Sequence, residues 1–513
     1  MRAYGEGTGV ERYGCDRENM NIPRIMFAAP KSGSGKTLIT CAMLGACKER
    51  QLHIVSCKCG PDYIDPMFHR TVLEIPSENL DTYFTDEEQT RRLLCEFVSE
   101  QEHSPELVVM EGVMGLYDGL GGVRKEGSSY HLASVTKTPI ILVVDVHGMG
   151  QTMIPVISGI LQYDKEHLIR GIILNRISRH FYESMKPMLE EELSVPVLGY
   201  MESHSELVID SRHLGLKLPA EMDNIHKTLS QASAYLCETV DIDGILAIAR
   251  KVYDLCVEGE NDGERSIVGE TESTNVDRGL DGSLIGKQTS SSSVTLAVAR
   301  DEAFCFYYEE NLRLLEKAGI HITYFSPLRD ERLPEEADGI LLGGGYPELY
   351  AEALSRNISM RESIRTAIRN GMPSLAECGG FMYLHKELQD DKGRIFPMVG
   401  VINGRTYYVG KSVRFGYVEI CEDGEQAHFL MKDRPMKGHE FHYYDSTLCG
   451  EDAYAVKPVG SRKWNCCHIG ENHWWGFPHL YYPSCPEFVD AFADHMQRYH
   501  VGKDDNSSLP KND

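Results

Sequence analysis

A glycine- and serine-rich loop near the start of the chain has the composition of a phosphate site. Residues 30–37 read Pro-Lys-Ser-Gly-Ser-Gly-Lys-Thr and stand between a short apolar run and a helical pattern. Small residues let backbone amides approach phosphate oxygens, and the following helix adds the positive end of its dipole. In the pattern Gly-x-x-x-x-Gly-Lys-Thr, the lysine contacts the β and γ phosphates and the threonine binds Mg²⁺. A proline replaces the first glycine here, and such a turn also begins ordinary helices. The predicted nucleotide-binding residues are Gly33, Gly35, Lys36 and Thr37.

Carboxylates follow two of the predicted strands. Glu111 ends an apolar run at 107–110, and we expect it to bind Mg²⁺ beside Thr37, because phosphate oxygens and water fill only part of an octahedral shell. Its alternative role is to cap the strand. Asp62 and Asp65 lie in a proline-flanked loop, where they can also be ordinary turn residues. Their place at the carboxyl end of a parallel strand favours a ligand site. A further carboxylate, Asp118, lies in a loop with three glycines.

A single cysteine, Cys378, stands where a short apolar strand turns into an apolar helix, in Pro-Ser-Leu-Ala-Glu-Cys-Gly-Gly-Phe-Met. A thiol at such a sharp turn lies near helix amides, which lower its pKa and can donate to a developing oxyanion. A buried structural cysteine is the alternative, but the two following glycines favour a nucleophile. The strand and glycine loop at 341–348 can supply the other oxyanion amide. The predicted oxyanion residues are Gly344, Gly345 and Gly379.

Alternating elements must position these groups. Apolar strand-like runs occur at 24–29, 53–56, 107–110, 140–146 and 171–174, separated by helix-length stretches, with a helical pattern at 38–49. This alternation predicts a parallel sheet with helices on both faces. The pattern restarts with strands at 294–299, 320–325 and 339–342 and a helix at 304–318. The fold class predicted is therefore α/β, with two units.

Composition divides the chain and excludes several classes of protein. A segment rich in Gly, Ser, Thr, Asp and Glu is typical of a linker. The predicted division is a leader at 1–22, an ATP-binding domain at 23–256, a linker at 257–293, a second α/β domain at 294–497 and a polar tail at 498–513. The net charge of −25 argues against binding nucleic acid. No run has the length of a membrane span or the form of a signal peptide, so we expect a cytoplasmic protein with no membrane partner.

The fifteen cysteines are an odd count without a disulfide framework, and reduced thiols are expected. Cys57 and Cys59, and the adjacent Cys466 and Cys467, lack the spacing of a zinc knuckle, which argues against a structural metal.

Five motifs of the N-terminal half occur together, which are SGSGKT at 32–37, GPDYIDP at 60–66, NLD at 79–81, EGVMGLYDG at 111–119 and RHLGL at 212–216. With these motifs the N-terminal half resembles the cobyrinate a,c-diamide synthase family. The resemblance implies a domain similar to dethiobiotin synthetase, in which ATP activates a corrin carboxylate as an acyl phosphate before ammonia attacks. It also implies the cofactors ATP and Mg²⁺, with a tetrapyrrole polycarboxylate, glutamine and ATP as small-molecule substrates. The resemblance implies that Mg²⁺ is bound by Thr37, Asp65 and Glu111. It places Asp62, Tyr63 and Asp118 near the acid substrate. It also implies that Asn175 contacts adenine.

The C-terminal half resembles the class I, triad-type glutamine amidotransferases over residues 294–497. That family places its general base late in the chain, which implies that His479 serves Cys378. His439 is the competing base, and His442 follows in the same Gly-His-Glu-Phe-His segment. Members of the family follow the base with a glutamate or histidine two residues later, whereas this chain has Tyr481. The third member of the triad is therefore open.

The sequence leaves several hypotheses about the function open. Cobyric acid synthase and nickel-sirohydrochlorin a,c-diamide synthase fit the same chemistry. A P-loop partition or regulatory ATPase, with Lys31 as the extra lysine of a deviant loop, is the alternative from another class. Cys378 at its turn argues against that alternative. The oligomeric state, the order of amidation and an ammonia tunnel are not specified, and a homo-oligomer remains open.

Overall fold

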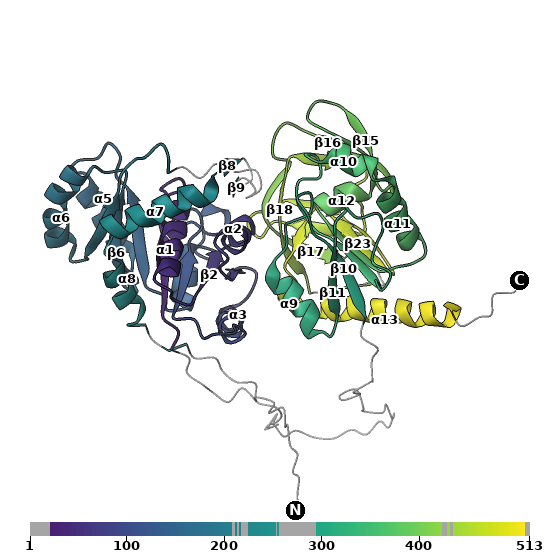
Figure 1. The fold of residues 1–513 in the computed structure, drawn as a ribbon, viewed down its shortest axis with the longest axis horizontal. Helices are drawn as coiled ribbons and strands as arrows, with labels where there is room; N and C mark the ends of the chain where they lie inside the picture. The colour runs from purple at the N-terminus through teal and green to yellow at the C-terminus, as the bar shows by residue number, and fades with distance from the viewer. Residues whose placement is uncertain are drawn as a thin grey trace, which may run out of the picture.

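Two α/β lobes lie side by side in the computed structural model of the chain (Figure 1). The structure describes residues 21–207, 211–212, 215–216, 224–252, 254–255, 294–422, 428–430 and 434–507. We call the part up to residue 255 the N-terminal lobe and the part from residue 294 the C-terminal lobe. Most of the expected leader, the whole expected linker at 257–293 and the last residues of the expected tail lie outside the described residues. No described helix has the length and hydropathy to span a bilayer.

The N-terminal lobe is built on one seven-stranded sheet in which every pair of neighbours is parallel. Its central strand carries the phosphate loop at its carboxyl end. In spatial order the strands are β3 (Ser77–Leu80), β2 (Ile54–Cys59), β4 (Leu107–Glu111), β1 (Arg24–Ala28), β5 (Ile140–Asp145), β6 (Ile169–Asn175) and β7 (Val197–Met201). A separate two-stranded ribbon joins β8 (Ser211–Arg212) to β9 (Gly215–Leu216).

Helices cover both faces of this sheet. Ile25 and Phe27 of β1 are fully buried in one apolar cluster, whereas Met26 and Ala28 are fully buried in another. Alternate residues of a strand point to opposite faces, so both faces are packed, as is usual for parallel sheets. One layer contains α1 (Lys36–Glu49), α2 (Ile64–Val72), α7 (Ile225–Thr239) and α8 (Ile242–Ala249). The other contains α3 (Glu87–Ser99), α4 (Ser129–Val135), α5 (Met153–Tyr163) and α6 (Arg179–Leu193).

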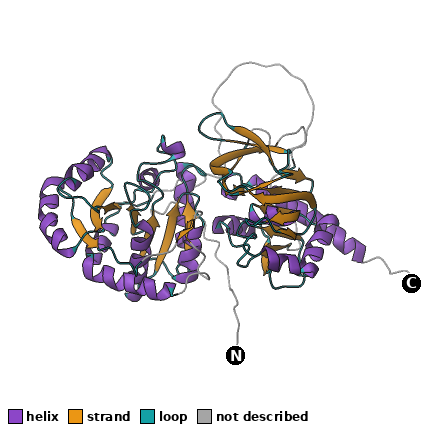
Figure 2. Ribbon diagram, turned by 90° about the horizontal axis from the view of Figure 1, so that it is seen from above, coloured by secondary structure: helices purple, strands orange, loops and turns teal. Residues whose placement is uncertain are grey.

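The C-terminal lobe combines a mostly parallel sheet with two smaller sheets (Figure 2). The first has the order β11 (His321–Phe325), β10 (Thr295–Ala299), β12 (Gly339–Leu342), β13 (Ser374–Glu377), β23 (His473–Gly476) and β22 (His468–Gly470). The second has the order β15 (Ile395–Pro397), β14 (His385–Gln389), β16 (Ile402–Tyr408) and β19 (Tyr444–Ser446). The third, antiparallel throughout, has the order β21 (Lys463–Cys466), β20 (Ala453–Val456), β17 (Arg414–Glu422), β18 (Met436–His442) and β24 (His479–Leu480).

Helices also flank the mostly parallel sheet of this lobe. On one side lie α9 (Glu309–Lys317) and α13 (Glu487–Ser507). On the other lie α10 (Ala351–Arg356), α11 (Ile358–Arg369) and α12 (Gly379–Leu384). The last helix therefore extends past residue 497, into the segment expected to be a polar tail.

Two elements differ from the prediction for physical reasons. The helix expected from residue 304 begins at Glu309, because the amides of residues 305 and 306 donate to the carbonyl of Gly344 instead of starting a helix. The edge strand β3 was not expected, since Ser-Glu-Asn-Leu has no apolar alternation. Its Glu78 side chain faces the other lobe, where Arg313 of α9 forms a two-pronged ion pair with it.

An aromatic cluster joins the lobes. Phe84 of the N-terminal lobe is buried and stacks on Tyr481, with ring centroids 4.7 Å apart. The rings of Tyr308 and Tyr417 meet Phe84 edge on. A polar contact between the lobes lies at the edge of this cluster, where the hydroxyl of Tyr417 donates to Asp81 at 2.7 Å. The lobes thus share part of one apolar core.

Substituting Phe84 tests whether this cluster holds the lobes together. Removing a buried phenylalanine ring costs about 3–5 kcal/mol of unfolding free energy, because it leaves a cavity. We expect Phe84→Ala to lower the thermal transition measured by scanning calorimetry by several degrees. Phe181→Ala, on the exposed face of α6, is the control and should leave the transition nearly unchanged. Equal transitions in the two variants would contradict the assignment.

Candidate active site

The phosphate loop joins β1 to α1 and is fixed by the end of β6. Gly33 and Gly35 both have positive φ values. A Cβ at Gly35 would lie 2.3 Å from the side-chain nitrogen Nδ2 of Asn175. That nitrogen donates to the carbonyl of the loop's second serine at 2.8 Å. Lys36 Nζ donates to the carbonyl of Met114 at 2.6 Å, and burial, helped by nearby Lys58, lowers its pKa to about 8. Asn175 therefore packs on the loop, and its predicted contact with adenine stays a prediction.

The groups predicted to bind Mg²⁺ lie together beside the loop. The hydroxyl of Thr37 donates to Glu111 Oε1 at 2.6 Å, and Lys58 Nζ donates to the same oxygen at 2.9 Å. Lys58 also pairs with Asp65, so one ammonium group joins both carboxylates. Burial raises the pKa of Glu111, whereas Lys58 opposes that shift. The other carboxylate oxygen of Glu111 is buried and has no hydrogen-bond partner among the described residues.

This donor set fits Mg²⁺. One hydroxyl and two carboxylates are hard oxygen ligands, and Mg²⁺ in nucleotide sites takes its remaining ligands from phosphate and water. Within the described ranges, no three His, Cys, Asp or Glu side chains gather so that they could hold a metal ion by themselves. Thr37, Asp65 and Glu111 would therefore hold the ion together with the nucleotide.

Lys58 is a site residue that the sequence analysis did not assign. It is buried at the carboxyl end of β2, and although burial opposes its charge, Asp65 and Glu111 hold its pKa well above the ordinary value. A lone lysine in an otherwise uncharged buried strand was the signal for it, because lysine is almost never buried without a partner.

A cavity of about 590 Å³ lies between the lobes, beside the phosphate loop. We call it the interface cavity. Asp62, Asp118 and Met114 line its N-terminal side, so Lys36 reaches the cavity wall through its bond to Met114. Burial, reinforced by Asp65, raises the pKa of Asp62 to about 7. The C-terminal side is lined by Phe415, Gly416, Tyr417, His439, Phe441, Lys457, Pro458 and Val459.

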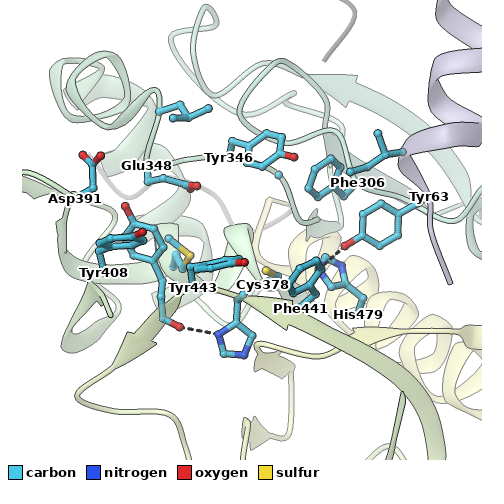
Figure 3. Close-up of a pocket in the computed structure, with 16 residues that line it drawn as sticks. Tyr63, Phe306, Tyr346, Glu348, Cys378, Asp391, Tyr408, Phe441, Tyr443 and His479 are labelled. Carbon is cyan, nitrogen blue, oxygen red and sulfur yellow. Dashed lines mark hydrogen bonds between the residues drawn. The ribbon is translucent and has the colours of Figure 1, made fainter. Parts of the chain in front are cut away.

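A second pocket, of about 670 Å³, lies in front of Cys378 (Figure 3). We call it the thiol pocket. Cys378 caps α12 with φ 45° and ψ −100°. Residues other than glycine rarely adopt this backbone conformation, which is typical of a nucleophile turn. Gly345 also lines the pocket. A Cβ at Gly379 would lie 3.0 Å from the amide nitrogen of Gly345, so the two predicted oxyanion loops touch.

His479 lies in the same pocket as Cys378, on the short strand β24 (Figure 3). A Cβ at Gly344 would lie 2.2 Å from His479 Cε1, which explains why the loop there needs a glycine. Burial lowers the pKa of His479 to about 3, with smaller contributions from His439 and His442, and burial raises that of Cys378. The resting thiol and imidazole are therefore both neutral.

The acid nearest His479 is Glu377, which the sequence analysis missed. Its carboxylate lies 4.0 Å from His479 Nδ1 and accepts a hydrogen bond from the hydroxyl of Tyr482 at 3.0 Å. Burial raises the pKa of Glu377 to about 8. Glu377 comes directly before Cys378 in the chain, whereas the family pattern places the third member of the triad two residues after the histidine. Tyr481, which stands there, stacks on Phe84 instead.

The competing histidines lie elsewhere. His439 lines the interface cavity and does not line the thiol pocket. His442 does line the thiol pocket, but its ring stacks on Phe477 and its Nδ1 donates to the carbonyl of Tyr444 at 2.6 Å. The geometry therefore favours His479 as the partner of Cys378.

The two lobes carry different chemistry. The N-terminal lobe carries a glycine-rich loop with a buried lysine between a strand and a helix, and the C-terminal lobe carries a thiol at a sharp turn beside a glycine loop and a histidine. A chain that combines them falls in the class of ATP-dependent ligases that take nitrogen from glutamine.

Comparison with known proteins gives the family. The family model described as CobQ/CobB/MinD/ParA nucleotide binding domain matches residues 25–215, and that described as CobB/CobQ-like glutamine amidotransferase domain matches residues 295–469. The cobyrinate a,c-diamide synthase of Caldanaerobacter subterraneus is 36% identical over 93% of this chain and 98% of its own length. That of Priestia megaterium is 34% identical over 93% and 97%. The chain belongs to the cobyrinate a,c-diamide synthase family.

The hydroxyl of Thr37 provides a test of the metal site. We expect Thr37→Val to weaken the binding of ATP with Mg²⁺ about tenfold, since one ligand is lost and one hydrogen bond to Glu111 is broken. Titration of ATP with and without Mg²⁺, followed by calorimetry, measures the effect. Thr40→Val on the same helix is the matched control, because its buried hydroxyl has no partner among the described residues. An equal loss in both variants would remove Thr37 from the metal site.

Proposed function

We propose that the chain converts the a and c carboxylates of cobyrinate into carboxamides, using ATP and ammonia released from glutamine. The observation that carries this proposal is the interface cavity, in which the acidic loops beside the phosphate site meet an aromatic face of the glutaminase lobe. Its broad apolar wall suits a macrocycle, and Lys457, whose Nζ donates to the carbonyl of Tyr417, adds a positive charge that suits a carboxylate. A substrate in this cavity lies between the source of the phosphoryl group and the source of the nitrogen. Because ATP and glutamine are cytoplasmic metabolites, we place the reaction in the cytoplasm.

The first half-reaction takes place in the thiol pocket. His479 accepts the proton of the Cys378 thiol as the sulfur attacks the side-chain amide of glutamine. Amides of Gly345 and Gly379 stabilise the oxyanion, and the C–N bond breaks as His479 returns the proton to the leaving ammonia. Water then hydrolyses the glutamyl thioester to glutamate and restores the thiol.

The second half-reaction takes place where the phosphate loop meets the interface cavity. The substrate carboxylate attacks the γ phosphorus of ATP and forms an acyl phosphate and ADP, while Lys36 holds the phosphates. Ammonia then attacks the acyl carbon, phosphate leaves, and a proton is lost to give the amide. Mg²⁺, held by Thr37, Asp65 and Glu111, would neutralise charge on the β and γ phosphates. Asp62 and Asp118 orient the acid substrate, and the raised pKa of Asp62, caused by burial and by Asp65, weakens its repulsion of a carboxylate.

A direct test is to supply cobyrinate, sirohydrochlorin and nickel sirohydrochlorin separately, each with ATP, Mg²⁺ and glutamine. Mass spectrometry then counts the amides formed on each macrocycle. Two amidations of cobyrinate support the proposal. If only a sirohydrochlorin is amidated, the choice of substrate is wrong. If none of the three acids is amidated, the assignment as a ligase of these acids is wrong.

Loss of the thiol should be selective. We expect Cys378→Ala to abolish glutamine-dependent amidation, because no other described group in the pocket can form the thioester. Ammonia-dependent amidation should remain near the wild-type rate, since the phosphate site lies in the other lobe. Parallel assays with glutamine and with ammonium chloride measure the two activities. Loss of both would mean that Cys378 supports the fold and not the release of ammonia.

Loss of the phosphate-loop lysine should not be selective. We expect Lys36→Ala to reduce amidation at least a hundredfold with glutamine and with ammonia alike, because both nitrogen sources require an activated carboxylate. Formation of ADP should fall in parallel with the amide. Ammonia-dependent amidation that survives the substitution would contradict the assignment of the loop.

A further inference from the structure

One hydrogen bond joins the two sites directly. The hydroxyl of Tyr63, in the loop between β2 and α2 of the N-terminal lobe, lies 3.0 Å from His479 Nε2 of the C-terminal lobe. The two rings are also in contact, with centroids 4.9 Å apart. Both side chains are almost completely buried, and Phe306 and Tyr308 pack against the ring of Tyr63. Figure 3 shows this bond at the end of the thiol pocket, beside Cys378.

The bond occupies one of the two nitrogens that a catalytic histidine uses. A histidine that serves a nucleophile binds an orienting group through one ring nitrogen and the nucleophile through the other. In His479, Nδ1 faces Glu377 at 4.0 Å and Nε2 binds Tyr63, whichever tautomer the ring adopts. In the described part of the chain, no hydrogen bond joins Cys378 Sγ to either nitrogen. The general base is thus held by the other lobe instead of by its thiol.

Tyr63 is also part of the wall between the two cavities. The thiol pocket and the interface cavity have three lining residues in common, which are Tyr63, Ile64 and Phe441. Ammonia formed in the first must reach an acyl phosphate in the second. A path through this wall passes Tyr63, Ile64 and Phe441, and none of these three side chains carries a charge that could trap the molecule as ammonium.

The loop that carries Tyr63 belongs to the ligase site. Its neighbour Asp62 lines the interface cavity. Asp65 is joined to Glu111 by Lys58, which forms an ion pair with each of them. Ligands that bind to these carboxylates therefore act on the backbone that positions the Tyr63 hydroxyl. Occupancy of the ligase site and the position of His479 are linked through one short segment.

We propose that Tyr63 is the positioning residue that couples the two sites: its hydroxyl holds His479 away from Cys378, and its ring closes, with Ile64 and Phe441, the passage for ammonia. The proposal rests on the proposed function. When substrates fill the ligase site, the loop shifts, the bond to His479 breaks and the passage opens. Glutamine is then hydrolysed only when an acceptor is present.

Tyr63→Phe removes the hydroxyl and keeps the ring. We expect this variant to release glutamate from glutamine alone, without ATP or tetrapyrrole, about tenfold faster than wild type, the change that one hydrogen bond of ordinary net strength produces. Alkylation of Cys378 by iodoacetamide should also reach half its maximal rate at a lower pH, because His479 becomes free to accept the thiol proton. A purely structural role would not move that pH profile.

Tyr308→Phe is the matched control. The Tyr308 hydroxyl donates to the carbonyl of Pro61 at 2.9 Å, so the variant loosens the same loop without touching His479. Its glutamate release and its alkylation profile should match those of wild type. Equal increases in the two variants, or no increase in Tyr63→Phe, would overturn the proposal.

The passage is tested separately with Ile64→Trp, which adds bulk to the shared wall. We expect the amide formed per glutamate released to fall about fivefold with glutamine as the nitrogen source, while glutamate release in the presence of all substrates persists. Because Ile64 also lines the interface cavity, ammonia-dependent amidation is measured beside it and should fall less. An equal fall in amide with both nitrogen sources would overturn this passage. If wild type itself releases no glutamate with all substrates present, the proposed function fails, and that outcome is distinct from a failure of the coupling.

Discussion

Desolvation of polar groups where the lobes meet is the constraint on which the rest of the structure depends. Asp62 lies in the loop after β2, Glu78 in β3 and Asp81 directly after β3, and the C-terminal lobe removes all three from water. Burial raises the pKa of all three carboxyl groups. Such groups are tolerated only when partners replace water, and Tyr417 and Arg313 provide those partners for Asp81 and Glu78. The same exclusion of water would protect an acyl phosphate in the interface cavity from hydrolysis.

Patterns within a short stretch of chain predicted the elements that position the candidate site. Strands buried on both faces appear as continuous apolar runs, and so β1, β4 and β5 were predicted closely. The phosphate loop and the turn at Cys378 are local too, because each depends on small residues between a strand and a helix. The family, the fold class and the two kinds of domain could therefore be predicted from sequence alone.

Contacts between the lobes could not be predicted in this way. In β18 the buried positions alternate with half-buried ones that include Lys437, His439 and Phe441. These three face another lobe instead of water, so the usual division into apolar and polar faces is lost. Tyr63 and His479 are 416 residues apart in the chain, and no local pattern specifies their bond. Glu377 was missed for a related reason, since only the meeting of β13 with β24 brings it near His479.

The interface cavity has one wall from each lobe, and this limits how members of the family can diverge. Tyr417 and Phe441 belong to the glutaminase lobe, but they line the cavity of the ligase site. A substitution there that admits a different macrocycle therefore changes the ligase site through the part of the gene that encodes the glutaminase. Changes in the loop around Tyr63 likewise reach the glutaminase from the other segment. Selection for a new substrate therefore acts on both halves at once. The two halves are expected to have been inherited as a pair, and recombination that exchanged one of them between relatives would separate walls that had adapted to each other.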